Sequence, residues 1–257
     1  MKIMTTFQIT KPQPILEGTL STLQDAEVRP AYAEAVKKLV RDNSSMGEKW
    51  QGRVLDLLLT PMKTPSDDGT LIGSNPYMNT LLARIGIPLV ELPRLRQAYE
   101  QNNNKSPFPG NYVETGLALI PERGNYQINR DLAKILDTDF KKRNIPLGKG
   151  RVPNFSQLML VPDQTIGLAF TLNETADKNN VPNLRDFNWN YGGKNGLFRA
   201  YLNNYSDWCA DGGLLENSNS CGRVVEYNAE GVAPKNLTPG VQMDKISKRL
   251  ADFISVR

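Results

Sequence analysis

The side chains best suited to chemistry in this 257-residue chain are a few carboxylates in its C-terminal third. Asp186, Asp207, Asp211 and Glu216 could supply a pair for acid–base catalysis, but nothing in their spacing holds any two at catalytic distance. The chain contains no histidine, which excludes Ser-His-Asp and Cys-His catalysis and histidine-ligated zinc. The sequence therefore offers no catalytic residues, and we expect the protein not to be an enzyme.

Motifs for metals and phosphates are incomplete. Cys209 and Cys221 are too few for a structural zinc site. A disulfide between them is possible, although a cytoplasmic setting disfavours it, and whether they pair is left open. The Gly-Gly-Lys run at residues 192–194 lacks the upstream glycine and the following Ser or Thr of a phosphate-binding loop. Asp-Asp-Gly at residues 67–69 lacks the ligand spacing of a calcium loop. We therefore expect no metal and no cofactor.

The most distinctive stretch is polar and runs over residues 201–221. Of these 21 residues, 15 are Asn, Asp, Ser, Tyr, Cys or Gly, which leaves too little apolar surface to form a core. Leu202, Trp208, Leu214 and Leu215 interrupt it at intervals. Such a pattern is typical of a binding surface held by a scaffold, where tyrosine gives rigid contact area and small polar residues give adaptable hydrogen bonds. The alternative is a long polar loop on an ordinary domain.

Residues 196–199, Trp208 and residues 218–225 resemble the variable region of the target proteins of diversity-generating retroelements, most closely those of archaea and their viruses. Upstream segments resemble the scaffold of the same family: residues 107–109, 114–119, 132–134 and 166–170. In that family, adenines of a template RNA are copied with errors, so AAY codons for Asn can become codons for many residues, but never for Trp, Glu, Gln, Lys or Met. Between Asn195 and Cys221, only Trp208 and Glu216 lie outside the reachable set.

The resemblance covers residues 50–228 and implies an α+β protein. The fold it implies is the C-type lectin fold of the formylglycine-generating-enzyme type, with a mainly helical N-terminal part. It also implies a protein that binds varied ligands, which would be proteins or cell-surface molecules. The alternatives are a virion or cell-surface attachment protein with a fixed ligand, and an enzyme of the same fold. The Glu-Pro-Asn and Trp-Asn-Asp motifs of calcium-dependent sugar binding in lectins are absent.

On this resemblance, variable-type residues between 198 and 221 are expected to point to solvent and contact the ligand. They are Phe198, Ala200, Tyr201, Asn203, Asn204, Tyr205, Ser206, Asp207, Cys209, Ala210, Asp211, Gly212, Gly213, Asn217, Ser218, Asn219, Ser220 and Cys221. A second set is expected to anchor this segment to the scaffold. It comprises Leu197, Arg199, Leu202, Trp208, Gly222, Arg223 and Val224.

Apolar periodicity and turn residues predict the elements that hold these side chains. We expect helices over residues 23–42, 46–59, 76–85, 93–101 and 129–143, and strands over residues 112–120, 157–161, 165–172 and 224–227. Within the helical spacing of residues 23–42, the early Pro30 suggests that the first helix begins there, with the proline in its first turn. Asn129 is the expected N-cap of the fifth helix. A long irregular segment is expected between the last two strands. The chain should end in a helix over residues 239–256 and begin with an irregular arm that has one short strand near residues 7–9.

The polar segment at residues 102–107 suggests a boundary. We divide the chain into a helical N-terminal part packed on the core (1–105), a C-type lectin-like domain with its variable region at 196–223 (106–228), and a C-terminal extension carrying a helix (229–257).

Net charge and hydropathy exclude further classes of protein. The net charge of +4 is not gathered into a basic stripe, so we expect no nucleic-acid partner. No apolar run approaches the ~20 residues that span a bilayer, and residues 1–6 lack the apolar segment of a signal peptide. We therefore expect a cytoplasmic location, unless the protein reaches a surface or particle by a specialised route. The oligomeric state, the ligand and the role of the C-terminal helix are left open.

Overall fold

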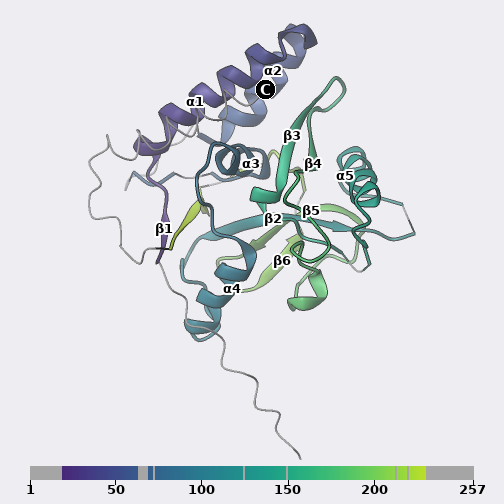
Figure 1. The fold of residues 1–257 in the computed structure, drawn as a ribbon. Coiled ribbons are helices and arrows are strands. Elements are labelled where there is room, and N and C mark those ends of the chain that lie inside the picture. Colours follow the sequence, from purple (N-terminus) through teal and green to yellow (C-terminus); the bar gives the residue numbers. More distant parts are fainter. Residues whose placement is uncertain are drawn as a thin grey trace, which may run out of the picture.

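The computed structural model describes residues 19–62, 69–71, 73–123, 125–148, 150–211, 213–218 and 220–229. Helices and strands are mixed along the chain, which confirms the expected α+β class (Figure 1). The α-helices are α1 (Asp25–Asp42), α2 (Glu48–Leu59), α3 (Pro76–Arg84), α4 (Leu92–Gln101) and α5 (Arg130–Lys142).

The described strands form three small sheets. The largest has the order β6-β5-β2-β7, in which β2 (Tyr112–Ile120) runs antiparallel to β5 (Gly196–Leu202) and parallel to β7 (Gly222–Arg223). Its outer strand β6 (Trp208–Asp211) pairs antiparallel with β5. The other two are antiparallel pairs, one of β3 (Leu158–Asp163) with β4 (Gly167–Leu172), the other of β1 (Thr19–Thr22) with β8 (Val225–Asn228).

The four-stranded sheet separates two hydrophobic clusters. On one face, Leu117 and Leu197 join a cluster made with α1, α2, α3, α5 and the β3–β4 hairpin. On the other face, Ala118 and Phe198 pack with Leu95 of α4. Figure 1 shows α1, α2 and α3 gathered at one end of the molecule and α4 set apart from them. Because both faces of its central strands are covered, β2 is buried at every position.

The N-terminal helices pack directly on later strands. The indole Nε1 of Trp50 on α2 donates a 2.7 Å hydrogen bond to the carbonyl of Gly167, and the ring of Tyr77 on α3 lies 4.7 Å from that of Phe170 on β4. The larger cluster therefore draws side chains from both sides of the segment 102–107, within which Ser106 is itself buried.

The first helix does not begin at Pro30. It begins at Asp25, so Pro30 lies inside it and leaves the carbonyl of Ala26 without its helical hydrogen bond. The buried side chains of Val28 and Tyr32 on either side of the proline offset that loss through their contacts with the core.

Asn129 occupies the N-cap position of α5, as expected, but its side chain does not cap the helix. Its backbone is left-handed (φ 47°), and its side chain makes no bond to the first turn of α5. Its Nδ2 group instead donates to the carbonyl of Leu197 at 2.8 Å and to that of Gly213 at 3.2 Å. Asn129 thus ties the start of α5 to β5 and to the loop after β6.

The segment expected to be irregular contains two strands of the main sheet, β5 and β6. Apolar residues lie on both faces of β5, so the sequence lacks the alternation that marks a half-exposed strand. The predicted short strand near residues 7–9 and the helix over residues 239–256 lie outside the described residues, as do residues 67 and 68 of the suspected calcium turn. Within the described part of the chain, none of the helices combines the length and the apolar character needed to cross a bilayer.

Candidate ligand-binding surface

The alternation of side chains on β5 and β6 decides which residues of the polar stretch can meet a ligand. On β5, Phe198, Ala200 and Leu202 point into the α4-side cluster, and on β6 so do Trp208 and Ala210. Arg199 and Tyr201 lie on the opposite face. The strands are paired so that Arg199 is opposite Asp211 and Tyr201 is opposite Cys209.

Four residues expected to face solvent are buried, and the expectation is wrong for them. Phe198 and Cys209 are each 4% exposed, and Ala200 and Ala210 are not exposed at all. For Phe198, Ala200 and Ala210 the reason is geometric: every second residue of these strands must point toward the α4-side cluster, whatever its type. Cys209 lies on the opposite face of the sheet, where Tyr201 and Asn203 lie beside it. The anchors Leu197, Leu202, Trp208, Gly222 and Val224 are buried, whereas Arg199 and Arg223 are half-buried.

The remaining residues of the expected contact set form the accessible part of the surface. Those that are half-buried are Tyr201, Asn203, Asn204, Ser206, Asp211 and Ser218; those that are exposed are Tyr205, Asp207, Gly213, Asn217, Ser220 and Cys221. Tyr205 is the most open of the large side chains, with 81% of its surface exposed. Gly212 and Asn219 lie outside the described residues.

The turn that joins β5 to β6 is organised by Asn203. Its Oδ1 atom accepts hydrogen bonds from the backbone N–H groups of Tyr205 and Asp207, both at 2.8 Å. The turn is also tied to the segment after α4, because the Ser206 hydroxyl accepts a 2.8 Å bond from the N–H of Ser106. Tyr205 therefore projects from a turn whose backbone is fixed on both sides.

A row of aromatic and acidic side chains crosses the sheet on the face of Arg199. The hydroxyl of Tyr201 donates to the carboxylate of Asp211, and burial, together with that hydrogen bond, raises the pKa of Tyr201. The ring of Tyr201 meets the ring of Tyr112 edge-on, with centroids 5.8 Å apart. The N–H of Tyr112 in turn donates to the carbonyl of Cys221 at 3.0 Å. Sequence reasoning missed Tyr112, which lies 89 positions before its neighbour Tyr201.

Next to this row, on the same face of the sheet, lies a buried ion pair. The guanidinium of Arg199 pairs with the carboxylate of Glu114, whose side chain is fully buried on β2. The same guanidinium donates to the Tyr112 hydroxyl at 3.1 Å and to the carbonyl of Asn217 at 3.0 Å. Arg199 thus fastens the loop after β6 to the middle of the sheet. Sequence reasoning identified Arg199 as an anchor but missed Glu114, whose signal is a lone carboxylate in an apolar strand.

Burial raises the pKa of Glu114 to about 7, because the loss of hydration outweighs the attraction of Arg199. A carboxyl group whose pKa is higher in the folded state stabilises the fold below its unfolded pKa, and this contribution is lost as the pH rises through the folded value. We expect Glu114 to reduce the free energy of unfolding by about 3 kcal/mol between about pH 4.5 and 8.

Urea denaturation of the wild type and Glu114→Gln across this pH range tests the expectation. The unfolding free energy of the wild type minus that of Glu114→Gln should fall with rising pH, because only the wild type has the titrating carboxyl. Contributions from the other titrating groups cancel in this difference. Parallel pH profiles would show that Glu114 does not titrate there.

The loop after β6 is held at further points. Leu215 is buried, Asn75 donates to the carbonyl of Glu216 at 3.1 Å, and the Ser218 hydroxyl donates to the carbonyl of Ser74 at 3.1 Å. Its polar side chains are therefore displayed on a backbone with fixed contacts.

The carboxylates considered for catalysis are bonded to other groups or exposed. Asp211 is engaged by Tyr201, Asp186 accepts from the N–H of Asn183, and Glu216 lies on the exposed loop. Burial, followed by the nearby carboxylates Asp211 and Asp207, raises the pKa of the Cys209 thiol to about 11, which disfavours a nucleophilic thiolate. No disulfide joins Cys209 to Cys221. Within the described ranges, no three Cys, Asp or Glu side chains are grouped so as to hold a metal ion.

Comparison of the chain with protein-family models, curated proteins and solved structures finds no match.

Proposed function

We propose that this protein is a ligand-binding protein whose surface is diversified by a retroelement and displayed on a C-type lectin scaffold of the formylglycine-generating-enzyme type. The observation that carries the proposal is the separation of roles within the polar stretch. Its apolar anchors, such as Leu197, Leu202 and Trp208, are buried. Most of its Tyr, Asn, Ser and Asp side chains are half-buried or exposed, on a backbone held by hydrogen bonds. This arrangement lets exposed side chains change with little cost to folding.

The same arrangement favours binding over catalysis. Rigid tyrosines and small polar side chains supply contact area and hydrogen bonds at low entropic cost. The accessible residues extend over the β5–β6 turn and the loop after β6, which suits a broad partner such as a protein or a cell-surface molecule better than a small substrate. The ligand-contact set proposed is the accessible set defined above, without Phe198, Ala200, Cys209 and Ala210.

Sequencing tests this proposal most directly. A near-copy of the codons for residues 196–223, differing at adenines and lying near a reverse transcriptase gene, is expected beside the gene. Across many cells of one population, variation should concentrate at exposed positions such as Tyr205, Asn217 and Ser220. The codons for Ala200, Trp208 and Ala210 should stay constant, because their side chains fill the core. Equal variation in the scaffold and in the polar stretch, with no template copy, would contradict the proposal.

The exposed tyrosine gives a biochemical test. Tyr205→Ala should change the free energy of unfolding by less than about 0.5 kcal/mol, because the ring is 81% exposed. Tyr201→Ala is the matched comparison and should cost more, since that ring contacts Tyr112 and its hydroxyl is bonded to Asp211. Chemical denaturation of both variants distinguishes them; equal losses would mean that Tyr205 supports the fold rather than being available to a ligand.

A further inference from the structure

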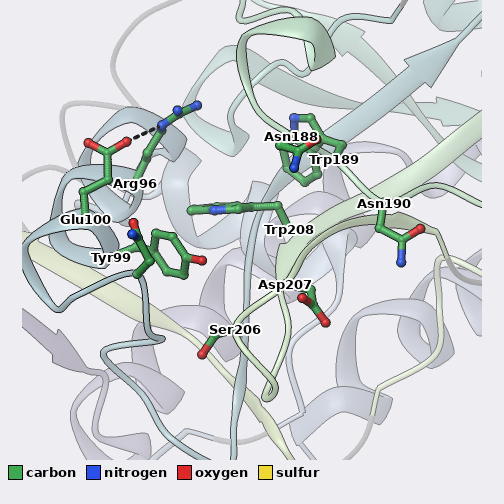
Figure 2. Close-up of a pocket in the computed structure, with 10 residues that line it drawn as sticks. Arg96, Tyr99, Glu100, Asn188, Trp189, Asn190, Ser206, Asp207 and Trp208 are labelled. Atoms are coloured by element: carbon green, nitrogen blue, oxygen red, sulfur yellow. Dashed lines mark hydrogen bonds and ion pairs between the residues drawn. The ribbon is translucent and has the colours of Figure 1, made fainter. Parts of the chain in front are cut away.

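A pocket of about 440 Å³ opens on the α4 side of the sheet, away from the face that carries Tyr201 (Figure 2). Helix α4 contributes Arg96, Tyr99 and Glu100, the β5–β6 turn contributes Asp207, and the first residue of β6 contributes the ring of Trp208. The segment of residues 188–190 completes the wall. The volume lies within the range of small-molecule sites, about 300–1,000 Å³.

The base of this pocket is a rigid aromatic frame. The ring of Trp208 contacts Tyr99, with centroids 5.5 Å apart and planes at 68°, and Trp189, with centroids 5.7 Å apart and planes at 71°. Trp208 is only 8% exposed, whereas Tyr99 and Trp189 are half-buried. Such a frame presents apolar surface to a ligand without losing much side-chain freedom on binding.

Two amides on the polar rim of the pocket lack an internal partner in the described part of the chain. Asn188 and Asn190 are exposed, and their side-chain amides make no hydrogen bond to any other described residue. The backbone of Asn190 is nevertheless fixed, because its N–H donates to Trp208 at 2.7 Å and its carbonyl accepts from Ala210 at 2.9 Å. Each amide offers both donors and acceptors at a defined place.

The charges of the pocket disfavour an ionic ligand. The guanidinium of Arg96 is paired with Glu100 at 2.8 Å and stacks over the ring of Phe187, so it is not open to an anion. Because Arg96 neutralises Glu100, Asp207 is the carboxylate of this lining without a cationic partner among the described residues, and a single exposed carboxylate attracts a cation only weakly. A neutral ligand rich in hydroxyl groups satisfies both the amides and Asp207, because a hydroxyl group can donate and accept.

We propose that this pocket binds a neutral saccharide. The C–H surface of a sugar ring would lie against the exposed parts of Trp189 and Tyr99, and its hydroxyls would bond to Asn188, Asn190 and Asp207. Most of these residues lie outside the segment 196–223. The site therefore goes beyond the proposed diversified surface and shares only Asp207 of its proposed contacts with it, so its other contacts do not depend on whether that segment is diversified.

Tryptophan fluorescence of the full chain provides the assay, because two of the three tryptophans lie in the pocket. The third, Trp50, is buried on α2 and serves as an internal reference. The probes are the methyl glycosides of glucose, mannose, galactose and N-acetylglucosamine, with tetramethylammonium and inorganic phosphate as ionic comparisons. A saturable change is expected with at least one glycoside and with neither ion, and it should be reduced in Trp189→Phe.

Amide variants locate the site. The double variant Asn188→Ala/Asn190→Ala should weaken glycoside binding about tenfold or more, through the loss of two hydrogen bonds. Asn179→Ala, an exposed amide beside a different pocket, should leave binding unchanged. Tyr205→Ala should also leave it unchanged, which separates this site from the diversified surface.

The proposal is overturned if none of the four glycosides binds saturably, or if tetramethylammonium or phosphate binds in their place. It is equally overturned if a glycoside binds but its affinity is the same in the Asn188→Ala/Asn190→Ala variant. Circular dichroism of each variant confirms that the fold is retained.

Discussion

Replacing Arg199 by alanine should reduce the free energy of unfolding by about 3–5 kcal/mol at pH 8, because it leaves a buried carboxylate without its partner. Glu114 is fully buried, and Arg199 also donates to Tyr112 and Asn217, which lose those bonds in the variant. Urea denaturation measures the loss. A loss this large would show that a residue within the polar stretch supports the sheet as a whole.

The pH dependence of this loss identifies its cause. Glu114 is already neutral at pH 5 with Arg199 present, because its pKa is about 7. Without Arg199 that pKa should rise further, so at pH 8 the folded variant must either take up a proton or hold an unpaired buried carboxylate. The destabilisation should therefore be smaller at pH 5 than at pH 8. A double variant with methionine at positions 114 and 199 should recover much of the stability, because it removes both charges together.

Arg223→Ala is the matched control, since Arg223 donates only to the nearby carbonyls of Ser220 and Gly222 in the described part of the chain. It should cost less than about 1 kcal/mol. If the two arginine variants lose equal stability, the buried ion pair does not have the role assigned to it.

Leu202→Ala should cost about 2–5 kcal/mol, because the side chain is fully buried in the α4-side cluster and its removal leaves a cavity. Leu214→Ala is the same substitution in the same polar stretch, but Leu214 is 55% exposed and should change stability by less than about 0.5 kcal/mol. Thermal and urea denaturation of the pair measure the difference. Similar melting temperatures would contradict the division of this stretch into anchors and displayed residues.

Local patterns in the sequence predict much of the fold. The face of α2 with Trp50 and Val54 is buried as helical spacing requires, and β2 has the bounds expected for it. Each of these predictions depends on residues a few positions apart. Helix spacing and strand composition are sufficient for such elements, because the same short segment contains both the signal and the structure.

The parts that could not be predicted depend on pairing between distant segments. The ion pair of Glu114 and Arg199 joins residues 85 positions apart and requires the register of β2 against β5. The burial of Ala200 and Ala210 depends on which face of the sheet meets α4, and residue type does not reveal this. A list of variable-type residues therefore overestimates the set of exposed residues, because half the positions of a covered strand point inward.

The pairing of β1 with β8 has a consequence for how the protein is made. The side chains of Ser21 and Glu226 in these strands are hydrogen-bonded across 205 positions of sequence, so the pair can close only after nearly all the described residues have left the ribosome. Such distant contacts form late and slowly during folding. The stretch 201–221 is synthesised just before β8, and the loop after β6 leads directly into β7 and β8. A version of the stretch that does not pack on the sheet would therefore displace the start of β8 and leave β1 and β8 unpaired and open to proteolysis.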